Sequence, residues 1–460
     1  MRHLSRALMI PSTLASALNG AGSRGTGVVA PGCVASAPVQ LLMYAPPTNY
    51  TAPGEHVEIQ QLILINRHGD RGPISRTAGT ALVMDAKKWK KRMPSEKTQT
   101  AWDTTNPVAG PRTPADTGES PFGQLTEVGA RQCFELGKWL QASISLHSPQ
   151  LLPMEARHIS AHATNIRRTQ QSVQNILGGL LGEASPRLSV PIIVRDLADE
   201  RLIPRPPACP PLRRRLDELG SAKRAATAST EEMEVITRVR CALGYPEGGL
   251  RLDQAREVLV CALSHGDALP AGVSDHDVGE LLTINAKQWD VLYSDSAVAT
   301  LSIGRLLAEV DEHLTAAAKG DEGAPRLVLL SGHDSTIVPL LSALGLFDRR
   351  WPPYAAHVRI ELGTVHGPPE GAADGATGLA AGTIAVRVLY QGLPLPLAQA
   401  VDEAAADPAG WVPLSSFQAL MRRAMMTADE YSEACAASSS AAAIGGDSAL
   451  QDTLVGSKKP

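Results

Sequence analysis

Three short apolar runs in this chain are each followed directly by polar residues, and this pattern constrains the fold more than any other feature. Residues 62–65 and 327–330 are rich in branched aliphatic side chains and have the length of buried strands. A third, less apolar run of the same length lies at residues 158–161, and stretches with helical spacing separate the three runs. This alternation predicts an α/β fold, with a mainly parallel sheet flanked by helices.

The residues that follow the three runs are arginines, histidines and an aspartate, which do not belong in an apolar core. In a parallel sheet the carboxyl ends of the strands lie at one edge, where ligands bind. We therefore expect these side chains to converge on a single site. They are Arg67, His68 and Arg71 after the first run, His162 after the second, and His333 and Asp334 after the third.

Such a set of side chains suits the transfer of a phosphoryl group. The guanidinium of an arginine matches phosphate oxygens and neutralises their charge. A histidine nucleophile can accept the phosphoryl group, which divides one difficult step into two. A carboxylic acid can then donate a proton to the leaving alcohol. The expected partner is therefore a small phosphate monoester.

The motifs themselves resemble those of a known family. The spacing Arg-His-Gly-x-Arg-x-Pro at residues 67–73 resembles the signature of the histidine acid phosphatases, and Gly-His-Asp at residues 332–334 resembles their second motif. Within that family the likeness is greatest to the lysophosphatidic acid phosphatases, which include a mitochondrial member. It extends over residues 125–129, 163–168, 333–341 and 344–355.

The resemblance implies a role for each of these residues. His68 would be the nucleophile that becomes phosphohistidine, and Asp334 would be the proton donor. Arg67, Arg71 and His333 would bind the phosphate. The resemblance implies no cofactor and no metal ion, and it implies a lysophospholipid as one candidate substrate.

One position departs from the family pattern as we align it. The resemblance implies a third phosphate-binding arginine at the position of His162, and Arg168 aligns with a family residue of its own. Because an imidazole lacks the bidentate fork of arginine, we expect slower turnover or a shift toward acid pH, where His162 is protonated. The alternative reading is a phosphate-binding relative with little or no activity. A phosphoglycerate mutase relative shares the Arg-His-Gly opening, but the rest of the motif speaks against it.

The predicted domain organisation follows changes in composition along the chain. Residues 55–203 and 285–436 form the α/β core, residues 204–284 form an inserted, mostly helical cap, and residues 437–460 form a disordered tail. Residues 1–54 contain arginines but no Asp or Glu, which is typical of a mitochondrial transit peptide. A secretory signal and a disordered tail are the alternatives for this segment.

Composition excludes several other classes of function. The formal net charge of −4 gives no basic excess of the kind that binds nucleic acid. No apolar run is long enough to cross a membrane. The six cysteines form no CxxC pair, so we expect no structural zinc site. Their even number permits disulfides, but free thiols are the interpretation that we favour.

Overall fold

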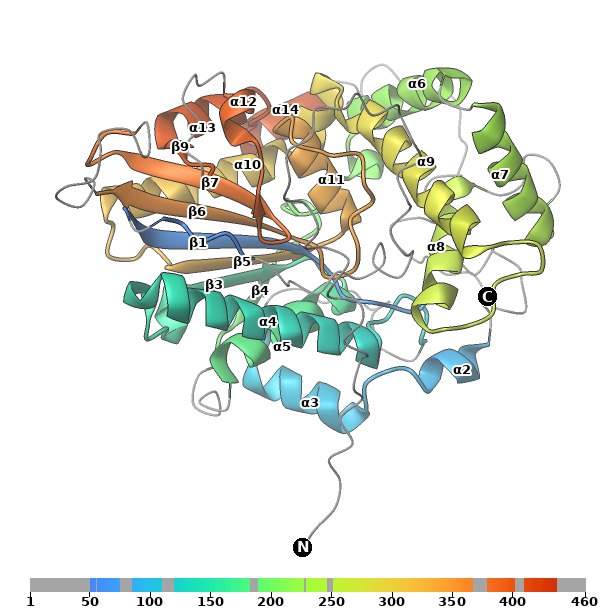
Figure 1. The fold of residues 1–460 in the computed structure, drawn as a ribbon, viewed down its shortest axis with the longest axis horizontal. Helices are drawn as coiled ribbons and strands as arrows, with labels where there is room; N and C mark the ends of the chain where they lie inside the picture. Colours follow the sequence, from blue (N-terminus) through green and yellow to red (C-terminus); the bar gives the residue numbers. More distant parts are fainter. Residues whose placement is uncertain are drawn as a thin grey trace, which may run out of the picture. The chain divides into compact units, whose positions relative to one another are not determined.

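The computed structural model describes residues 50–54, 56–74, 85–109, 120–182, 189–226, 229–245, 251–366, 379–401 and 409–436. In these residues a nine-stranded sheet lies between helices, as predicted (Figure 1). The strands are β1 (Val57–Arg67), β2 (Val108–Ala109), β3 (Ile159–Ala163), β4 (Ile192–Val194), β5 (Leu327–Gly332), β6 (His357–Val365), β7 (Ile384–Tyr390), β8 (Leu393–Pro394) and β9 (Val412–Pro413).

The sheet has a parallel half and an antiparallel half. The order is β2-β4-β3-β5-β1-β6-β7-β8, and β9 also pairs with β7. Strands β2, β4, β3, β5 and β1 are parallel, whereas β6 to β9 pair antiparallel. Strand β6 pairs with β1 on one side and β7 on the other, and β7 pairs in turn with β8 and β9, so both strands lie inside the sheet.

The continuous apolar runs of β1 and β5 are explained by burial on both faces of the sheet. Ile63 and Ile65 belong to one core cluster together with residues of α10 (Ser296–Lys319), α11 (Asp334–Ala343) and α13 (Leu414–Arg422). Leu62 and Leu64 belong to a second cluster, which includes residues of α4 (Glu127–His147) and α5 (Arg167–Leu181). Successive side chains of a strand point to opposite faces, so neighbouring leucines and isoleucines contribute to different cores.

The helices that cover the two faces begin and end largely where the sequence signals them. Thr126 caps α4, because its side chain accepts a hydrogen bond from the Gly129 N–H. The helices on the two faces are α4 (Glu127–His147), α5 (Arg167–Leu181), α10 (Ser296–Lys319), α11 (Asp334–Ala343) and α13 (Leu414–Arg422). The shorter helices are α2 (Ala86–Lys90), α3 (Glu96–Thr105), α12 (Leu397–Ala400) and α14 (Ala428–Ala436).

Between β4 and α10 the regular elements of the described chain are all helices. They are α6 (Pro210–Ala226), α7 (Thr230–Ala242), α8 (Leu252–Ser264) and α9 (Asp275–Tyr293), with one turn of 3-10 helix before α6. Residues of α7, α8 and α9 share a core cluster with Trp351 and Tyr354. We use the name cap for α6 to α9. The predicted limits of the insertion remain a prediction.

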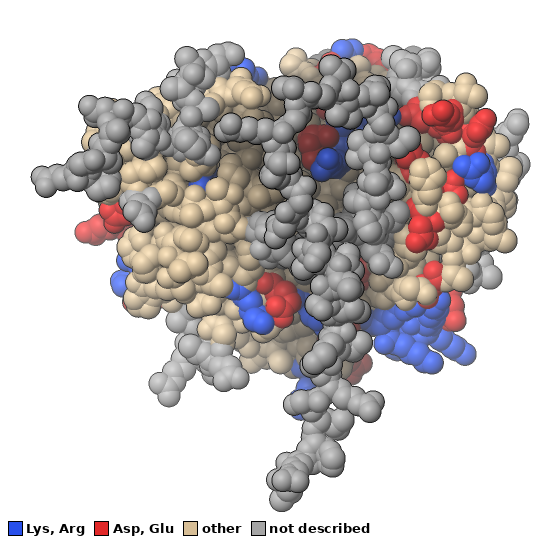
Figure 2. Space-filling view, in the orientation of Figure 1, with Lys and Arg blue, Asp and Glu red and all other residues tan. Residues whose placement is uncertain are grey.

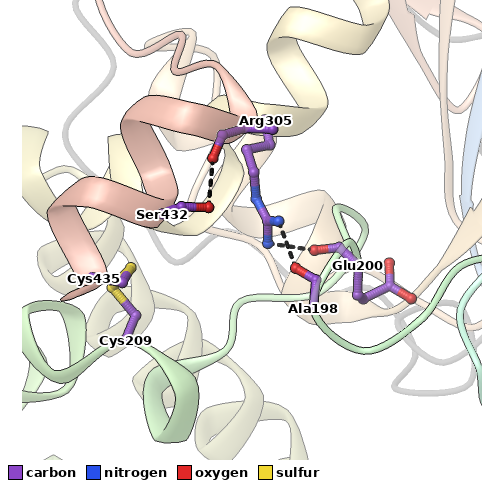
Figure 3. Close-up of a disulfide and its surroundings, with 7 residues drawn as sticks. Ala198, Glu200, Cys209, Arg305, Ser432 and Cys435 are labelled. Atoms are coloured by element: carbon purple, nitrogen blue, oxygen red, sulfur yellow. Dashed lines mark hydrogen bonds between the residues drawn. A yellow bond between two sulfur atoms is a disulfide. The ribbon is translucent and has the colours of Figure 1, made fainter.

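A disulfide joins the start of the cap to the last described helix. Cys209, which precedes α6, is bonded to Cys435 of α14, 226 positions away (Figure 3). Nearby, Arg305 of α10 donates hydrogen bonds to the carbonyl oxygens of Ala198 and Glu200. The prediction of free thiols is therefore wrong for this pair, and it holds for Cys133, Cys241 and Cys261. Cys33 lies outside the described residues.

None of the described helices combines the length and the apolar character that a membrane span requires. The predicted tail at residues 437–460 and all but the last five residues of the predicted segment 1–54 lie outside the described part of the chain.

Candidate active site

The polar ends of β1 and β5 lie side by side, as the sequence predicts. Arg67 is the register partner of Gly332, and the His68 N–H donates a hydrogen bond of 2.9 Å to the Gly332 carbonyl oxygen. The next residues of the β5 chain are His333 and Asp334. The end of β3 pairs with β5 from the other side, where Ala163 faces Ser331. Three strand ends thus reach the same edge of the sheet.

The loop that follows β1 packs directly on the first turn of α4. A side chain at Gly69 would place its Cβ 2.3 Å from the Gly129 carbonyl oxygen, and one at Gly129 would reach 2.1 Å from the Asp70 oxygen. Only glycine fits at both positions of this contact. Backbone donors of the loop are also bound by side chains, because the Asp70 N–H donates to Gln132 at 2.8 Å. The helix therefore fixes the position of His68.

His68 is held in the neutral form and in one tautomer. Its Nδ1 lies 2.7 Å from the Gly69 carbonyl oxygen, which can only accept a hydrogen bond. Nδ1 therefore carries the proton, and Nε2 keeps its lone pair. Burial lowers the pKa of His68 well below 6.5, and the positive charges of Arg168, Arg67 and Arg71 add to this. A neutral imidazole with a free Nε2 is what a nucleophile requires.

The second histidine of the site, His333, is oriented by α5 and the residues before it. Its Nδ1 accepts a hydrogen bond of 3.4 Å from Arg168, so its Nε2 carries the proton and donates to Thr164 at 3.0 Å. Thr164 in turn contacts Thr169 at 2.7 Å. The rings of His68 and His333 are 5.4 Å apart. Both imidazoles thus lie next to Arg168, at the start of α5.

Two arginines of the signature loop are fixed by different parts of the chain. Arg67 forms an ion pair with Asp334 at 3.2 Å and donates to the Pro352 carbonyl oxygen at 2.6 Å. Arg71 forms a buried ion pair of 2.6 Å with Glu257 of α8. Within the described residues, the buried Nε atoms of both arginines have no hydrogen-bond partner. An N–H donor is costly to bury without an acceptor. These two N–H groups are therefore suited to donate hydrogen bonds to a bound anion.

The carboxylate of Asp334 is surrounded by cations. Burial alone would raise its pKa, but the attraction of Arg67, Arg256 and Arg71 outweighs burial and lowers the pKa to about 2. Asp334 is therefore ionised in the substrate-free site at any pH above that value. Entry of a phosphate would reduce the positive field and make protonation of Asp334 easier.

His162 is not part of this group of side chains. Its strand neighbours Ala161 and Ala163 face the core of α4 and α5, so the alternation of β3 turns His162 to the face covered by α10. There its Nε2 contacts Ser160 at 2.9 Å, and its Nδ1 lies 3.9 Å from Glu309. Burial lowers the pKa of His162 to about 4, against the attraction of Glu309. The position predicted for the third arginine is thus turned away from His68.

Arg168 provides the positive charge that His162 lacks. It stands in the first turn of α5, where it contacts His333, and it is the charge that most lowers the pKa of both His68 and His333. The correction has a simple cause, because the site is completed by the helix that follows β3 rather than by β3 itself. The basic pair at residues 167–168 directly after a strand was the available signal.

Two further side chains reach the signature loop from the cap and were not predicted. Glu257 binds Arg71, and His265 places its Nε2 2.6 Å from the buried carboxylate of Asp70. The same segment supplies Asp267, which is bound by Arg92. No local pattern marks these contacts, since each joins residues at least 175 positions apart.

Lysine and arginine side chains also gather on the surface over α2 (Figure 2). The sequence there contributes Lys87, Lys88, Lys90 and Lys91. Lys88 contacts Asp267 at 2.7 Å, next to His265. A positive surface of this kind raises the local concentration of anions and the rate at which they associate.

Comparison with known proteins places this geometry in a family. The family model of the histidine phosphatase superfamily (branch 2) matches residues 58–238 and 293–369, which is more than half of the chain. Testicular acid phosphatase from Homo sapiens is 30% identical over 353 residues, covering 73% of this chain and 73% of its own. Lysophosphatidic acid phosphatase type 6 from Homo sapiens is 27% identical over 336 residues, covering 66% and 74%.

The fold has solved relatives as well. A Hafnia alvei phytase in complex with tartrate superimposes with a TM-score of 0.54 and covers 82% of this chain and 99% of its own, at 14% sequence identity. At that identity the likeness concerns the fold alone. The family match spans β1 with the signature loop as well as β5 with His333 and Asp334. The chain therefore belongs to branch 2 of the histidine phosphatase superfamily.

Proposed function

We propose that this protein hydrolyses phosphate monoesters through a phosphohistidine on His68. In the first step, the lone pair of His68 Nε2 forms a bond to phosphorus while the bond from phosphorus to the ester oxygen breaks. Asp334, protonated in the complex, donates its proton to that oxygen, and the alcohol leaves. In the second step, water attacks phosphorus, the bond to Nε2 breaks, and Asp334 takes up a proton from the water.

The observation that carries this proposal is the fixed tautomer of His68. Its Nδ1 proton is engaged by the Gly69 carbonyl oxygen, so the free lone pair is on Nε2. Arg67, Arg71 and Arg168 act on this imidazole as cations and would neutralise the phosphate oxygens as they gain charge. The alternative of a weakly active relative rested on a missing third arginine, and the place of Arg168 removes that reason.

The matching experiment is hydrolysis of a chromogenic phosphate monoester by the purified full-length protein between pH 4 and pH 8. A His68→Ala variant serves as the control, because it removes the nucleophile. We expect release of phosphate by the wild type, and a 32P-labelled substrate is expected to label the wild type but not His68→Ala after acid-free quenching. Equal rates for the two proteins would exclude the proposed mechanism.

We further propose lysophosphatidic acid as a substrate. Support comes from the similarity of 26–28% to lysophosphatidic acid phosphatases type 6 from four mammals. A comparison with glycerol 3-phosphate isolates the contribution of the acyl chain, since the two substrates share the same phosphorylated glycerol. We expect a higher kcat/KM for lysophosphatidic acid. A ratio near one would show that the acyl chain is not recognised and would leave the phosphatase proposal intact.

A further inference from the structure

A fourth arginine reaches the site from the cap and has no part in the mechanism above. Arg256 lies on α8, next to Glu257, and is 8% exposed. Its Nη1 is buried and has no hydrogen-bond partner among the described residues. Buried guanidinium donors are ordinarily satisfied, so an unpaired one calls for a ligand that the free protein does not contain.

Packing fixes where this guanidinium lies. Its central carbon is 3.5 Å from the centre of the Trp351 ring. Trp351 is itself held edge-on by Trp289, with ring centres 4.8 Å apart. Cation–π stacking on a buried, immobile ring orients the planar fork while leaving its edge N–H groups available. Arg256 is thus preorganised to bind an acceptor rather than filling space.

The stacking partner of Arg256 places it beside the leaving group. Trp351 directly precedes Pro352, whose carbonyl oxygen accepts from Arg67, and Arg67 is paired with Asp334. The charges around Arg256 agree with this position. Burial lowers its pKa to about 10, and the strongest opposing interaction is attraction to Asp334. The charge that acts most strongly on His68, by contrast, is that of Arg168. Since Asp334 donates its proton to the ester oxygen in the proposed reaction, a guanidinium coupled to Asp334 lies on the side of the departing alcohol.

A count of charges leads to the same conclusion. In the reactive complex Asp334 is protonated and neutral, whereas the bound phosphate carries about two negative charges. Glu257 and the phosphate together neutralise three of four positive charges in the site. The four cations are Arg67, Arg71, Arg168 and Arg256. One of these four positive charges remains in excess, and the unpaired Nη1 of Arg256 is available to a further anion.

We propose that Arg256 binds an anionic oxygen group on the leaving alcohol, so that among phosphate monoesters of short, acyl-free alcohols the enzyme favours those that carry a carboxylate or a second phosphate close to the ester oxygen. This inference rests on the proposed phosphatase function and adds a specificity-determining residue to it. A carboxylate or phosphate would accept one hydrogen bond from the unpaired Nη1 and a second from another N–H group of the same guanidinium.

Two esters with the same three-carbon chain test the proposal. 1-Propyl phosphate and 2-carboxyethyl phosphate differ only in whether the far end of the alcohol is a methyl group or a carboxylate. We expect the wild type to favour 2-carboxyethyl phosphate in kcat/KM by about tenfold or more, as one charge-assisted contact would provide. In Arg256→Gln the ratio of the two kcat/KM values is expected to fall toward one.

Arg251→Gln is the matched control, because Arg251 precedes the same helix, is exposed and is paired with Asp253. Arg251→Gln removes the same charge from the same region. If Arg256 acts through a specific contact, this control is expected to keep the wild-type ratio of the two kcat/KM values. Arg256→Lys retains a charge without the planar fork and is used if the glutamine variant fails to fold. We expect its ratio to lie between those of the wild type and one.

Three results would overturn the inference. They are a wild-type ratio near one, an unchanged ratio in the folded Arg256 variants, and an equal fall of the ratio in Arg251→Gln, which would indicate a general field. Failure of the proposed function looks different, since a protein that is not a phosphatase hydrolyses neither ester. Hydrolysis of 1-propyl phosphate without any preference rejects the role of Arg256 alone.

Discussion

Arg168 and His162 show how a shift of a few residues changes the chemistry of a site. His162 lies on the face of β3 that α10 covers, whereas Arg168, in the first turn of α5, contacts His333. We predict that Arg168→Gln lowers kcat/KM by about 30- to 1,000-fold, equivalent to about 2–4 kcal/mol of transition-state stabilisation. Steady-state kinetics with the chromogenic ester measures this loss.

The neighbouring residues supply the controls for this prediction. Arg167 binds Gln99 at 2.7 Å, so Arg167→Gln removes an equal charge from the same turn and is expected to cost far less activity. His162→Gln is expected to change kcat/KM by less than about threefold, because removal of a side chain outside the site costs little transition-state stabilisation. A large loss in His162→Gln with a small one in Arg168→Gln would restore the original assignment.

The pKa of Asp334 predicts how activity depends on pH. In the free enzyme this pKa is lowered to about 2, so above that pH the donor proton must arrive with the substrate as the monoanion of the phosphate ester. We therefore predict that kcat/KM falls as pH rises through the second pKa of the substrate, about 6 for a phosphate ester.

A pH profile of kcat/KM for esters with different second pKa values provides the check. The descending limb is expected to move with the substrate, since His68 has a pKa well below 6.5 and stays neutral over this range. His162→Gln serves as the control and is expected to leave the limb in place. A limb that stays fixed for all esters would assign the titration to an enzyme group.

Helix α8 is the element that links the cap to the signature loop. Glu257 accepts from Arg71 at 2.6 Å and also from the backbone N–H of Ile74. One turn further, the Cys261 thiol donates to the Arg71 carbonyl oxygen. Glu257 therefore acts on catalysis by positioning Arg71, and it touches no reacting atom in the proposed mechanism.

A double-mutant cycle isolates this positioning role. We predict that Glu257→Gln lowers kcat/KM by about tenfold or more, and that its effect is not additive with that of Arg71→Lys, with a coupling of about 1–3 kcal/mol. Asp253→Asn removes a carboxylate of the same helix that pairs with exposed Arg251, so little change is expected there. Additive losses would mean that Glu257 acts independently of Arg71.

The elements that the sequence predicts well are those with local signals. The α4 start at Thr126, the strands β1 and β5 and the convergence of their ends follow from capping and from apolar runs of strand length. Helix α11 begins at Asp334, three residues before its apolar stretch suggests, because His333 caps it. The contacts of α8 with the loop have no such signal, since they depend on how distant segments pack.

The chain as a whole is joined by links that no local pattern reveals. In the first described segment, Tyr50 donates to buried Glu361 at 2.7 Å, and Arg387 donates to the Thr51 and Ala52 carbonyl oxygens. The address carried by residues 1–54 remains a prediction. A fluorescent fusion of residues 1–56 tests it, with mitochondrial signal expected for a transit peptide and signal in the secretory pathway for the alternative.

The disulfide between Cys209 and Cys435 joins residues that are 226 positions apart in the described chain. Such a bond restricts the unfolded state most when the loop is long. We predict that the double variant with Cys209→Ser and Cys435→Ser loses about 2–4 kcal/mol of unfolding free energy. Its kcat/KM is expected to stay near the wild-type value, because neither cysteine contacts the site. Urea unfolding without reductant measures the loss, and exposed Cys241→Ser is the control.

Wild-type stability in the double variant would show that the two thiols are not bonded in solution. Such bonds persist in oxidising compartments, so a confirmed disulfide would favour the secretory alternative over the mitochondrial matrix.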